Sequence, residues 1–153
     1  MPGGNPRSTA RIGYHPIHVM LVPIPIVCFV GTLLSDIAYA ETANMQWANM
    51  SVWLLTFGIL IAILAVIAGL IDFLNEPRIR DLSAAWIHAV GNVLVLVLSI
   101  INAFIHSRDA YTSVVPTGLI LSAIVVAILL VTGWNGWTMV YKHHVAVSSE
   151  IDQ

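Results

Sequence analysis

Charge is scarce in this sequence of 153 residues, because Asp, Glu, Lys and Arg together make up only 9% of it. An average soluble domain has about 25% charged and about 45–50% apolar residues, whereas this chain is 58% hydrophobic and has a formal net charge of −2. This composition excludes a soluble globular domain and a disordered chain. The small number of Lys and Arg residues also excludes a nucleic-acid-binding protein.

Cysteine is nearly absent, since Cys28 is the only one in the chain. The chain therefore forms no internal disulfide and has no C-x-x-C-H motif for covalent attachment of haem. It also has no phosphate-binding loop, no metalloprotease motif and no nucleophile–base pair. The sequence thus contains no motif for independent catalysis.

The charged residues that are present lie in short clusters between four charge-free runs. These runs are residues 12–35, 42–71, 82–107 and 110–141. A helix needs about 20 apolar residues to cross the bilayer core, so each run can cross once. We predict membrane-spanning helices near residues 17–40, 48–72, 83–106 and 115–141. Short connections make neighbouring helices antiparallel, so the predicted fold is an all-α integral membrane four-helix bundle with up-down topology.

The bundle is predicted to be one transmembrane domain, residues 15–145, between an N-terminal tail (1–14) and a C-terminal tail (146–153). Five of the six Lys and Arg residues fall on the side of the tails, and Arg108 falls on the other side. In membrane proteins, Lys and Arg residues accumulate in the short loops on the cytoplasmic side of the membrane. We therefore expect both tails to be cytoplasmic and, in a bacterium, the protein to lie in the inner membrane.

The third predicted helix has a line of polar residues. At 100° per residue, the following five fall within about 40° of one line along the helix: His88, Asn92, Ser99, Asn102 and His106. Polar groups that face lipid are costly, so we expect this stripe to face the bundle interior. His88 and His106 lie roughly 27 Å apart along a helix and hence near opposite membrane faces.

The other predicted helices show small residues and a proline-rich segment. The second helix has one face formed by Ser51, Gly58, Ala62, Ala65, Gly69 and Asp72, and the fourth has a similar face formed by Gly118, Ser122, Thr132 and Gly136. Such faces indicate close helix packing or, alternatively, room for a flat group such as a tetrapyrrole. In the first helix Pro23 and Pro25 interrupt the backbone hydrogen bonds beside His18. Farther along, Thr32, Asp36 and Tyr39 share a face.

Five of the six histidines are predicted to lie near the cytoplasmic face: His15, His18, His88, His143 and His144. A polar residue inside a membrane is a candidate functional residue. For His88 with Asn92 the alternatives are an interhelical hydrogen bond, ligation of haem or metal, and a proton relay. For His143 and His144 the simplest interpretation is an interfacial position at the membrane surface.

Several short motifs occur in a characteristic order. They are His15-Pro16-Ile17-His18, the Pro23/Pro25 segment, Gly69-Leu70-Ile71-Asp72, His88-Ala89-Val90-Gly91-Asn92 and Gly136-Trp137-Thr138-Met139-Val140-Tyr141-Lys142-His143. Together, over roughly residues 13–147, they resemble the bacterial four-span family named domain of unknown function 2231. This chain departs from the family pattern at Val19 and His144, where proline and glycine are common.

The resemblance implies electron transfer at the membrane, because relatives occur fused to or beside Rieske-type and other redox proteins. We therefore predict a b-type cytochrome-like subunit that relays electrons between a partner oxidoreductase and the quinone pool. Histidine is a common axial ligand of haem iron. The predicted cofactor-binding residues are His18, His88, Gly91, Asn92 and His143, with His18 and His88 as the ligands of haem b.

Other interpretations remain open from the sequence. His106 or His143 is a candidate ligand at a second site, and Asn92 is a candidate partner for a free imidazole nitrogen. The histidines could instead pair with Asp72 or with each other. The chain could also be a structural or anchoring subunit of a larger complex, or a small transporter of metal or protons. Partners expected beside the lipid bilayer are other membrane or periplasmic redox subunits, and oligomerisation is expected.

Overall fold

Four long helices make up nearly all of the protein in the computed structural model, which describes residues 5–108 and 110–147. The first is divided into α1 (Ile17–Leu21) and α2 (Pro23–Thr42), and the others are α3 (Met45–Asn75), α5 (Ser83–His106) and α6 (Thr117–His143). Each is long and apolar enough to cross a membrane. The four predicted spans are thus confirmed, with ends that agree to within a few residues.

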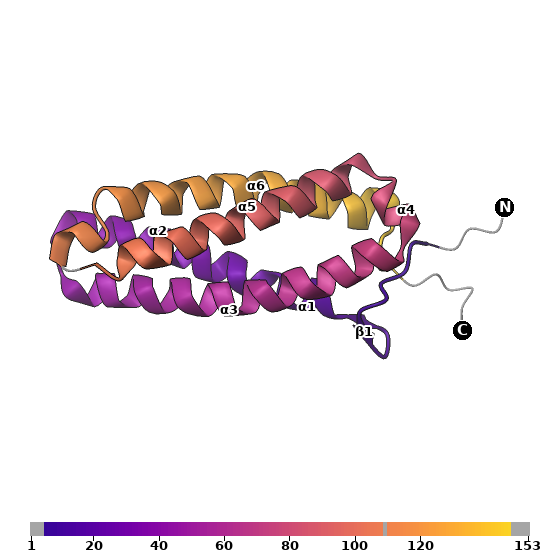
Figure 1. Ribbon diagram of the computed structural model, residues 1–153, viewed down its shortest axis with the longest axis horizontal. Helices are drawn as coiled ribbons and strands as arrows, with labels where there is room; N and C mark the ends of the chain where they lie inside the picture. Colours follow the sequence, from indigo (N-terminus) through magenta and orange to yellow (C-terminus); the bar gives the residue numbers. More distant parts are fainter. Residues whose placement is uncertain (1–4, 109, 148–153) are drawn as a thin grey trace.

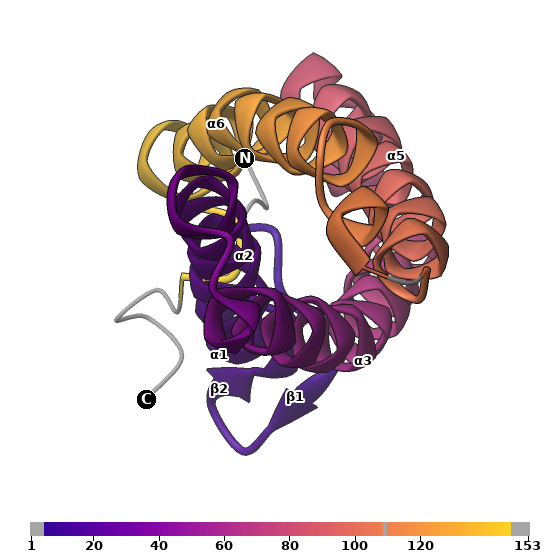
Figure 2. The same cartoon turned by 90° about the vertical axis from the view of Figure 1, so that its left-hand side faces the viewer.

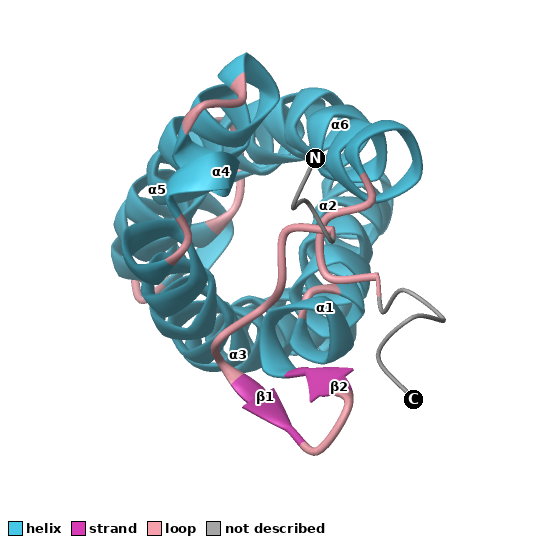
Figure 3. Ribbon diagram, turned by 90° about the vertical axis from the view of Figure 1, so that its right-hand side faces the viewer, coloured by secondary structure: helices cyan, strands magenta, loops and turns pink. Residues whose placement is uncertain are grey.

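The helices form an up-down bundle in which each helix has two neighbours (Figures 1 and 2). α2 packs along α3, and α5 packs along α6, and these two helix pairs contact each other less extensively. Seen from its end, the bundle is a ring in the order α2, α3, α5, α6, so α2 and α5 lie diagonally (Figure 3). The predicted diagonal placement of the first and third spans is confirmed.

The first span is interrupted at Val22, between α1 and α2. Pro23 begins α2 and has no N–H group to continue the α1 hydrogen bonds. The Val22 N–H still donates to the His18 carbonyl oxygen at 3.1 Å, and the helix resumes beyond it. The break therefore interrupts the helix one turn after His18.

Short, capped connections join the helices. The Asn44 side chain accepts a hydrogen bond from the Gln46 N–H at the start of α3. Between α3 and α5 lies the short helix α4 (Pro77–Arg80), whose N-cap is Glu76. Arg78 also donates to the Glu76 carboxylate at 2.8 Å, and this bond lowers the pKa of Glu76 to about 2. The helix η1 (Ala110–Ser113) lies between α5 and α6.

Large apolar side chains point outward along the whole length of the bundle. Exposed examples from each span are Val27, Trp53, Phe104 and Leu130. The buried side chains, in contrast, include many small and polar ones, among them Ser51, Ser99 and Thr132. A surface more apolar than the interior is expected of helices that lie in lipid.

The chain before α1 is folded, although the sequence was interpreted there as a tail. Strands β1 (Arg11–Ile12) and β2 (His15–Pro16) form a two-stranded antiparallel hairpin around Gly13, which has φ +60°. The segment before β1 crosses the end of the bundle (Figure 3). The predicted C-terminal tail, residues 146–153, lies outside the described residues after Val147.

The beginning and the end of the described chain meet at one end of the bundle, here named the near end. The Ala146 N–H donates to the Pro6 carbonyl oxygen at 2.8 Å, and the Asn5 side chain donates to the Val147 carbonyl oxygen at 3.2 Å. The opposite end, at the α2–α3 and α5–α6 connections, is named the far end (Figure 1). The described parts of both predicted tails therefore lie at the same end of the bundle.

Candidate functional site

His18 is held by α3 across the α1–α3 contact. Its Nδ1 lies 2.7 Å from the Ala65 carbonyl oxygen. Because a carbonyl can only accept, Nδ1 must carry the hydrogen, and the Nε2 of a neutral ring is then the nitrogen with a lone pair. The ring also packs on Gly69, one turn after Ala65, where an added Cβ would lie 2.8 Å from Nδ1.

His88 is held by α6 in the same way. Its Nδ1 donates to the Thr132 carbonyl oxygen at 2.8 Å. One turn after Thr132, an added Cβ at Gly136 would lie 3.1 Å from the His88 ring. The α1–α3 and α5–α6 pairs thus contain the same arrangement. A histidine on the first helix bonds to a backbone carbonyl of the second helix, and a glycine one turn after that carbonyl leaves space for the ring.

The two histidines meet between the helix pairs near the bundle axis. Their ring centroids are 5.8 Å apart and their planes are nearly perpendicular, at 84°. Both Nδ1 atoms are already bonded to carbonyls, so the Nε2 atoms of His18 and His88 remain for a ligand. Two imidazoles that bind one metal ion from opposite sides place their ring centres about 6 Å apart, since metal–nitrogen bonds are about 2 Å long. The separation of the two ring centres is therefore compatible with two histidine ligands of one metal ion.

The space beside these rings is small. A cavity of about 40 Å³ extends from His18 and Asn92 along α2 and α3 toward Phe29. Such a volume holds water molecules or an ion but not a porphyrin. A haem would fit only with the two helix pairs farther apart. His18 is held within one pair and His88 within the other, so this separation would leave both Nδ1 hydrogen bonds in place.

Gly91 and Asn92 have different surroundings from those expected. At Gly91 an added Cβ would lie 2.3 Å from Thr132 Cγ2, so this glycine lets α5 approach α6 closely. The Asn92 side chain donates to the His88 carbonyl oxygen at 2.7 Å, not to an imidazole nitrogen. Asn92, one of the candidate partners of the His88 ring, does not bond to that ring in the structure, because the Thr132 carbonyl oxygen of α6 does.

The remaining near-end histidines do not join this pair. His15 is exposed in the β-hairpin, His143 is the last residue of α6, and His144 ends that helix with φ +50°. Within residues 5–108 and 110–147, no three His, Cys, Asp or Glu side chains gather in a way that could hold a metal ion. A second site at His143 stays a prediction.

Asp72 binds the N-terminal segment and not a histidine. Its Oδ1 accepts from the backbone N–H groups of Thr9 and Ala10, both at 2.7 Å, and its carboxylate accepts from the Ser8 hydroxyl at 2.9–3.0 Å. The alternative in which His18 or His88 pairs with Asp72 is therefore wrong. Asp72 instead fixes the segment that crosses the near end of the bundle.

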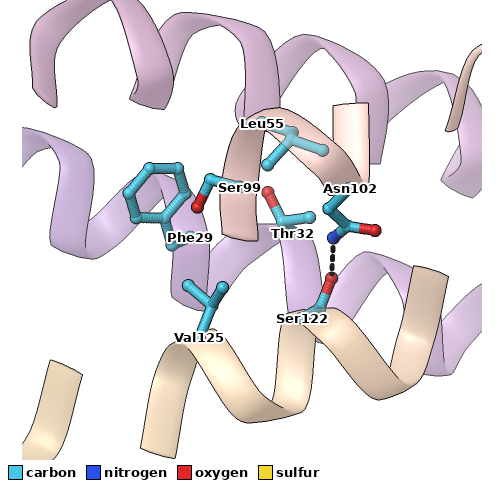
Figure 4. A pocket seen from close by; sticks show the side chains of 7 residues that line it. All are labelled: Phe29, Thr32, Leu55, Ser99, Asn102, Ser122 and Val125. Atoms are coloured by element: carbon cyan, nitrogen blue, oxygen red, sulfur yellow. Dashed lines mark hydrogen bonds between the residues drawn. The ribbon is translucent and has the colours of Figure 1, made fainter. Parts of the chain in front are cut away.

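A second polar centre lies toward the far end and joins all four helices. Asp36 of α2 is completely buried. Its Oδ1 accepts a short hydrogen bond from Ser51 of α3 and lies 3.0 Å from His106 Nε2 of α5. Its Oδ2 accepts from Ser122 of α6 at 2.6 Å. The Asn102 side chain donates in turn to Ser122 Oγ at 2.9 Å (Figure 4). We name these five residues the Asp36 cluster.

The position of His106 leaves neither ring nitrogen free for a metal. Nδ1 lies 3.0 Å from the Asn102 carbonyl oxygen, and Nε2 faces Asp36 and Ser51. An added Cβ at Gly118 would lie 2.8 Å from its ring, so α6 holds this histidine as closely as the other two are held. The geometry therefore does not favour the predicted second metal site at His106.

The expected inward orientation of the α5 stripe is confirmed, because Ser99, Asn102 and His106 are buried and the His88 ring contacts α6. Sequence reasoning did not predict that Asp36 meets His106. A signal was available, since both are polar, lie on inward faces and are close to the far ends of their helices. This signal did not predict the contact, because α2 and α5 lie diagonally in the bundle. The sequence of either helix alone does not show whether Asp36 and His106 lie at the same depth in the membrane.

Comparison with known proteins gives one match. The family model described as a predicted membrane protein, DUF2231, matches residues 14–149. No curated protein and no solved structure matches this chain. The matched range covers both histidines of the near-end pair and the whole Asp36 cluster.

Proposed function

We propose that this chain, which belongs to the DUF2231 family of predicted membrane proteins, is an electron-transfer subunit in which His18 and His88 hold one haem b. The observation that carries the proposal is the repeated arrangement of these two rings. Each donates Nδ1–H to a helix carbonyl, which fixes its tautomer and orientation, as metal-bound histidines commonly do. Two such rings from diagonal helices leave both Nε2 atoms for one ligand.

The chain's residues have defined roles in this proposal. Ala65 and Thr132 orient the two imidazoles through their carbonyl oxygens, and Gly69 and Gly136 leave space for the rings. The segment bound by Asp72 crosses the near end of the bundle (Figure 3). When bound, haem would supply one-electron oxidation and reduction. With no catalytic motif in its sequence, the chain would pass electrons between a partner oxidoreductase and quinone.

Haem binding is tested by the visible spectrum of the protein purified from cells supplied with haem. We expect a Soret band and a reduced-minus-oxidised spectrum typical of b-type haem in the wild type. His88→Ala and His18→Ala should each lose most of this absorbance, because one axial ligand is removed. His15→Ala is the matched control, since His15 is exposed, and it should retain the full spectrum.

The outcome that contradicts the proposal is a folded wild-type protein without haem after expression with excess haem. Retention of the complete spectrum in folded His88→Ala would also contradict the assignment of His88. Circular dichroism of each variant establishes that the helices are present, so loss of absorbance is not confused with loss of fold.

We further propose that the near end is cytoplasmic and that the protein lies in the inner membrane of a bacterium, with neighbouring subunits or further copies of the chain around it. The positive charges of the near end support this orientation. In a Cys28→Ala background, cysteine at the exposed position Tyr14 should be labelled only after the inner membrane is permeabilised. Cysteine at the exposed position Arg108, at the far end, should be labelled from outside that membrane. Labelling of Tyr14→Cys in intact cells would reverse the orientation.

A further inference from the structure

The hydrogen atoms of the Asp36 cluster can be counted from its geometry. His106 Nδ1 faces the Asn102 carbonyl oxygen, which can only accept, so Nδ1 carries a hydrogen. If His106 is neutral, its Nε2 is then an acceptor. An ionised Asp36 is also acceptor-only, yet its Oδ1 lies 3.0 Å from this Nε2. Two acceptors at that distance require a proton between them.

The two hydroxyl groups do not remove this requirement. The Ser51 hydroxyl has one hydrogen and contacts both Asp36 Oδ1 and His106 Nε2. The Ser122 hydroxyl accepts from the Asn102 side chain and donates to Asp36 Oδ2. One further proton must therefore reside on the Asp36–His106 pair, either as imidazolium beside carboxylate or as neutral imidazole beside a carboxylic acid.

The cluster lies between two apolar layers. On the near side, Phe29, Leu55, Val95 and Val125 belong to the central hydrophobic core. On the far side a single small layer, formed by Tyr39, Ala48 and Val114, covers the cluster. Among the described residues the only charged or titratable groups in the cluster are Asp36 and His106, since α3 and α6 contribute serines and the Tyr39 hydroxyl bonds to Met45.

One buried acceptor beside the pair is unused. The Asn102 Oδ1 atom is fully buried and has no hydrogen-bond partner within the described part of the chain. Figure 4 shows this oxygen pointing away from Ser99 and Phe29. Ser99 Oγ, on the near side, is likewise buried without a partner among the described residues. The site thus contains unsatisfied polar atoms next to an ionisable pair inside the membrane.

We infer that Asp36 and His106 bind one exchangeable proton inside the membrane, at a site that exchanges with the far side through the Tyr39–Val114 layer. On release, the N–H or O–H bond of the pair breaks and the proton passes to water at the far face. The pair then changes from net neutral to a net charge of −1. Buried carboxylate and histidine side chains of this kind serve as proton relays in membrane proteins. This inference does not depend on haem binding at His18 and His88.

The test measures both groups in protein reconstituted in nanodiscs. Histidine labelled with ¹⁵N reports the protonation and tautomer of His106 by NMR, and the infrared band of a carboxylic acid reports Asp36. Between pH 4 and pH 10 we expect one step in which the pair loses a single proton. Asp36→Asn keeps the shape of the side chain. In this variant the change in the His106 protonation signal should disappear, or it should occur at a proton concentration that differs at least tenfold from that of the wild type.

A matched control is His15→Ala, which removes an exposed histidine of the near end and should leave the step unchanged. The inference is overturned if neither signal changes between pH 4 and pH 10 in the wild type. It is also overturned if the same step persists in Asp36→Asn. The wild-type measurement alone decides the first point, so the test does not depend on a variant that folds.

Discussion

Replacing Asp36 with alanine is expected to cost about 3–5 kcal/mol of the free energy of unfolding, as is typical when one member of a buried charged pair is removed. The carboxylate joins α2 to the other three helices through Ser51, His106 and Ser122. Alanine would leave these three groups buried without their shared acceptor. Equilibrium unfolding in mixed micelles, followed by circular dichroism, measures the loss.

Asp36→Asn is the matched comparison for this prediction. Asparagine has nearly the same shape, and its amide can donate to the Nε2 of a neutral His106 while its oxygen accepts from a serine. We expect a loss of only about 1 kcal/mol, close to the value of one hydrogen bond. Equal stability of Asp36→Ala and the wild type would show that the Asp36 cluster does not hold the helices together.

The second large effect concerns two glycines of α6, of which only Gly118 should lose stability when it is replaced by alanine. At Gly118 an added Cβ would lie 2.8 Å from the His106 ring and 3.1 Å from the Ser113 carbonyl oxygen. The ring or the backbone would have to move, so we expect Gly118→Ala to lose about 1–3 kcal/mol.

Gly133→Ala is the control on the same helix, since an added Cβ there meets nothing within 4 Å. It should be neutral or gain about 0.5 kcal/mol, because alanine favours a helix more than glycine does. The same unfolding measurement compares both variants with the wild type. A Gly118→Ala protein as stable as Gly133→Ala would contradict the close contact between Gly118 and His106.

Much of the fold could be predicted from the sequence, because charged residues are rare within the spans and most of them lie near the span ends. The position of Pro23 likewise predicted the irregularity of the first span. The hairpin around Gly13 was missed, since each strand has only two residues and shows no alternating pattern. The interpretation of residues 1–14 as a tail also missed the hydrogen bonds between Asp72 and the segment Ser8–Ala10.

The candidate site was predictable in its inward faces but not in its partners. The stripe on α5 pointed correctly to the interior. However, His18 and His88 bond to backbone carbonyl oxygens of Ala65 and Thr132, and a backbone carbonyl leaves no mark in a sequence. The glycines of the second and fourth spans gave the clearest indirect indication of where the histidine rings pack. Gly69, Gly118 and Gly136 leave room for a flat group, but in the structure those flat groups are imidazole rings of the protein itself.

The confinement of each near-end histidine to one helix pair has a consequence for assembly in the bilayer. α1–α3 and α5–α6 can each settle into register as an inserted hairpin, because each has its own histidine–carbonyl contact. The hydrogen bonds described between the helices of different pairs all belong to the Asp36 cluster. Before the hairpins meet, the only partner described for the Asp36 carboxyl group is Ser51 of the same hairpin, and in lipid the neutral acid costs far less than the anion. The first hairpin would then bring the proton of the Asp36 carboxylic acid into the assembled bundle. When the second hairpin docks, Asp36 would share this proton with His106.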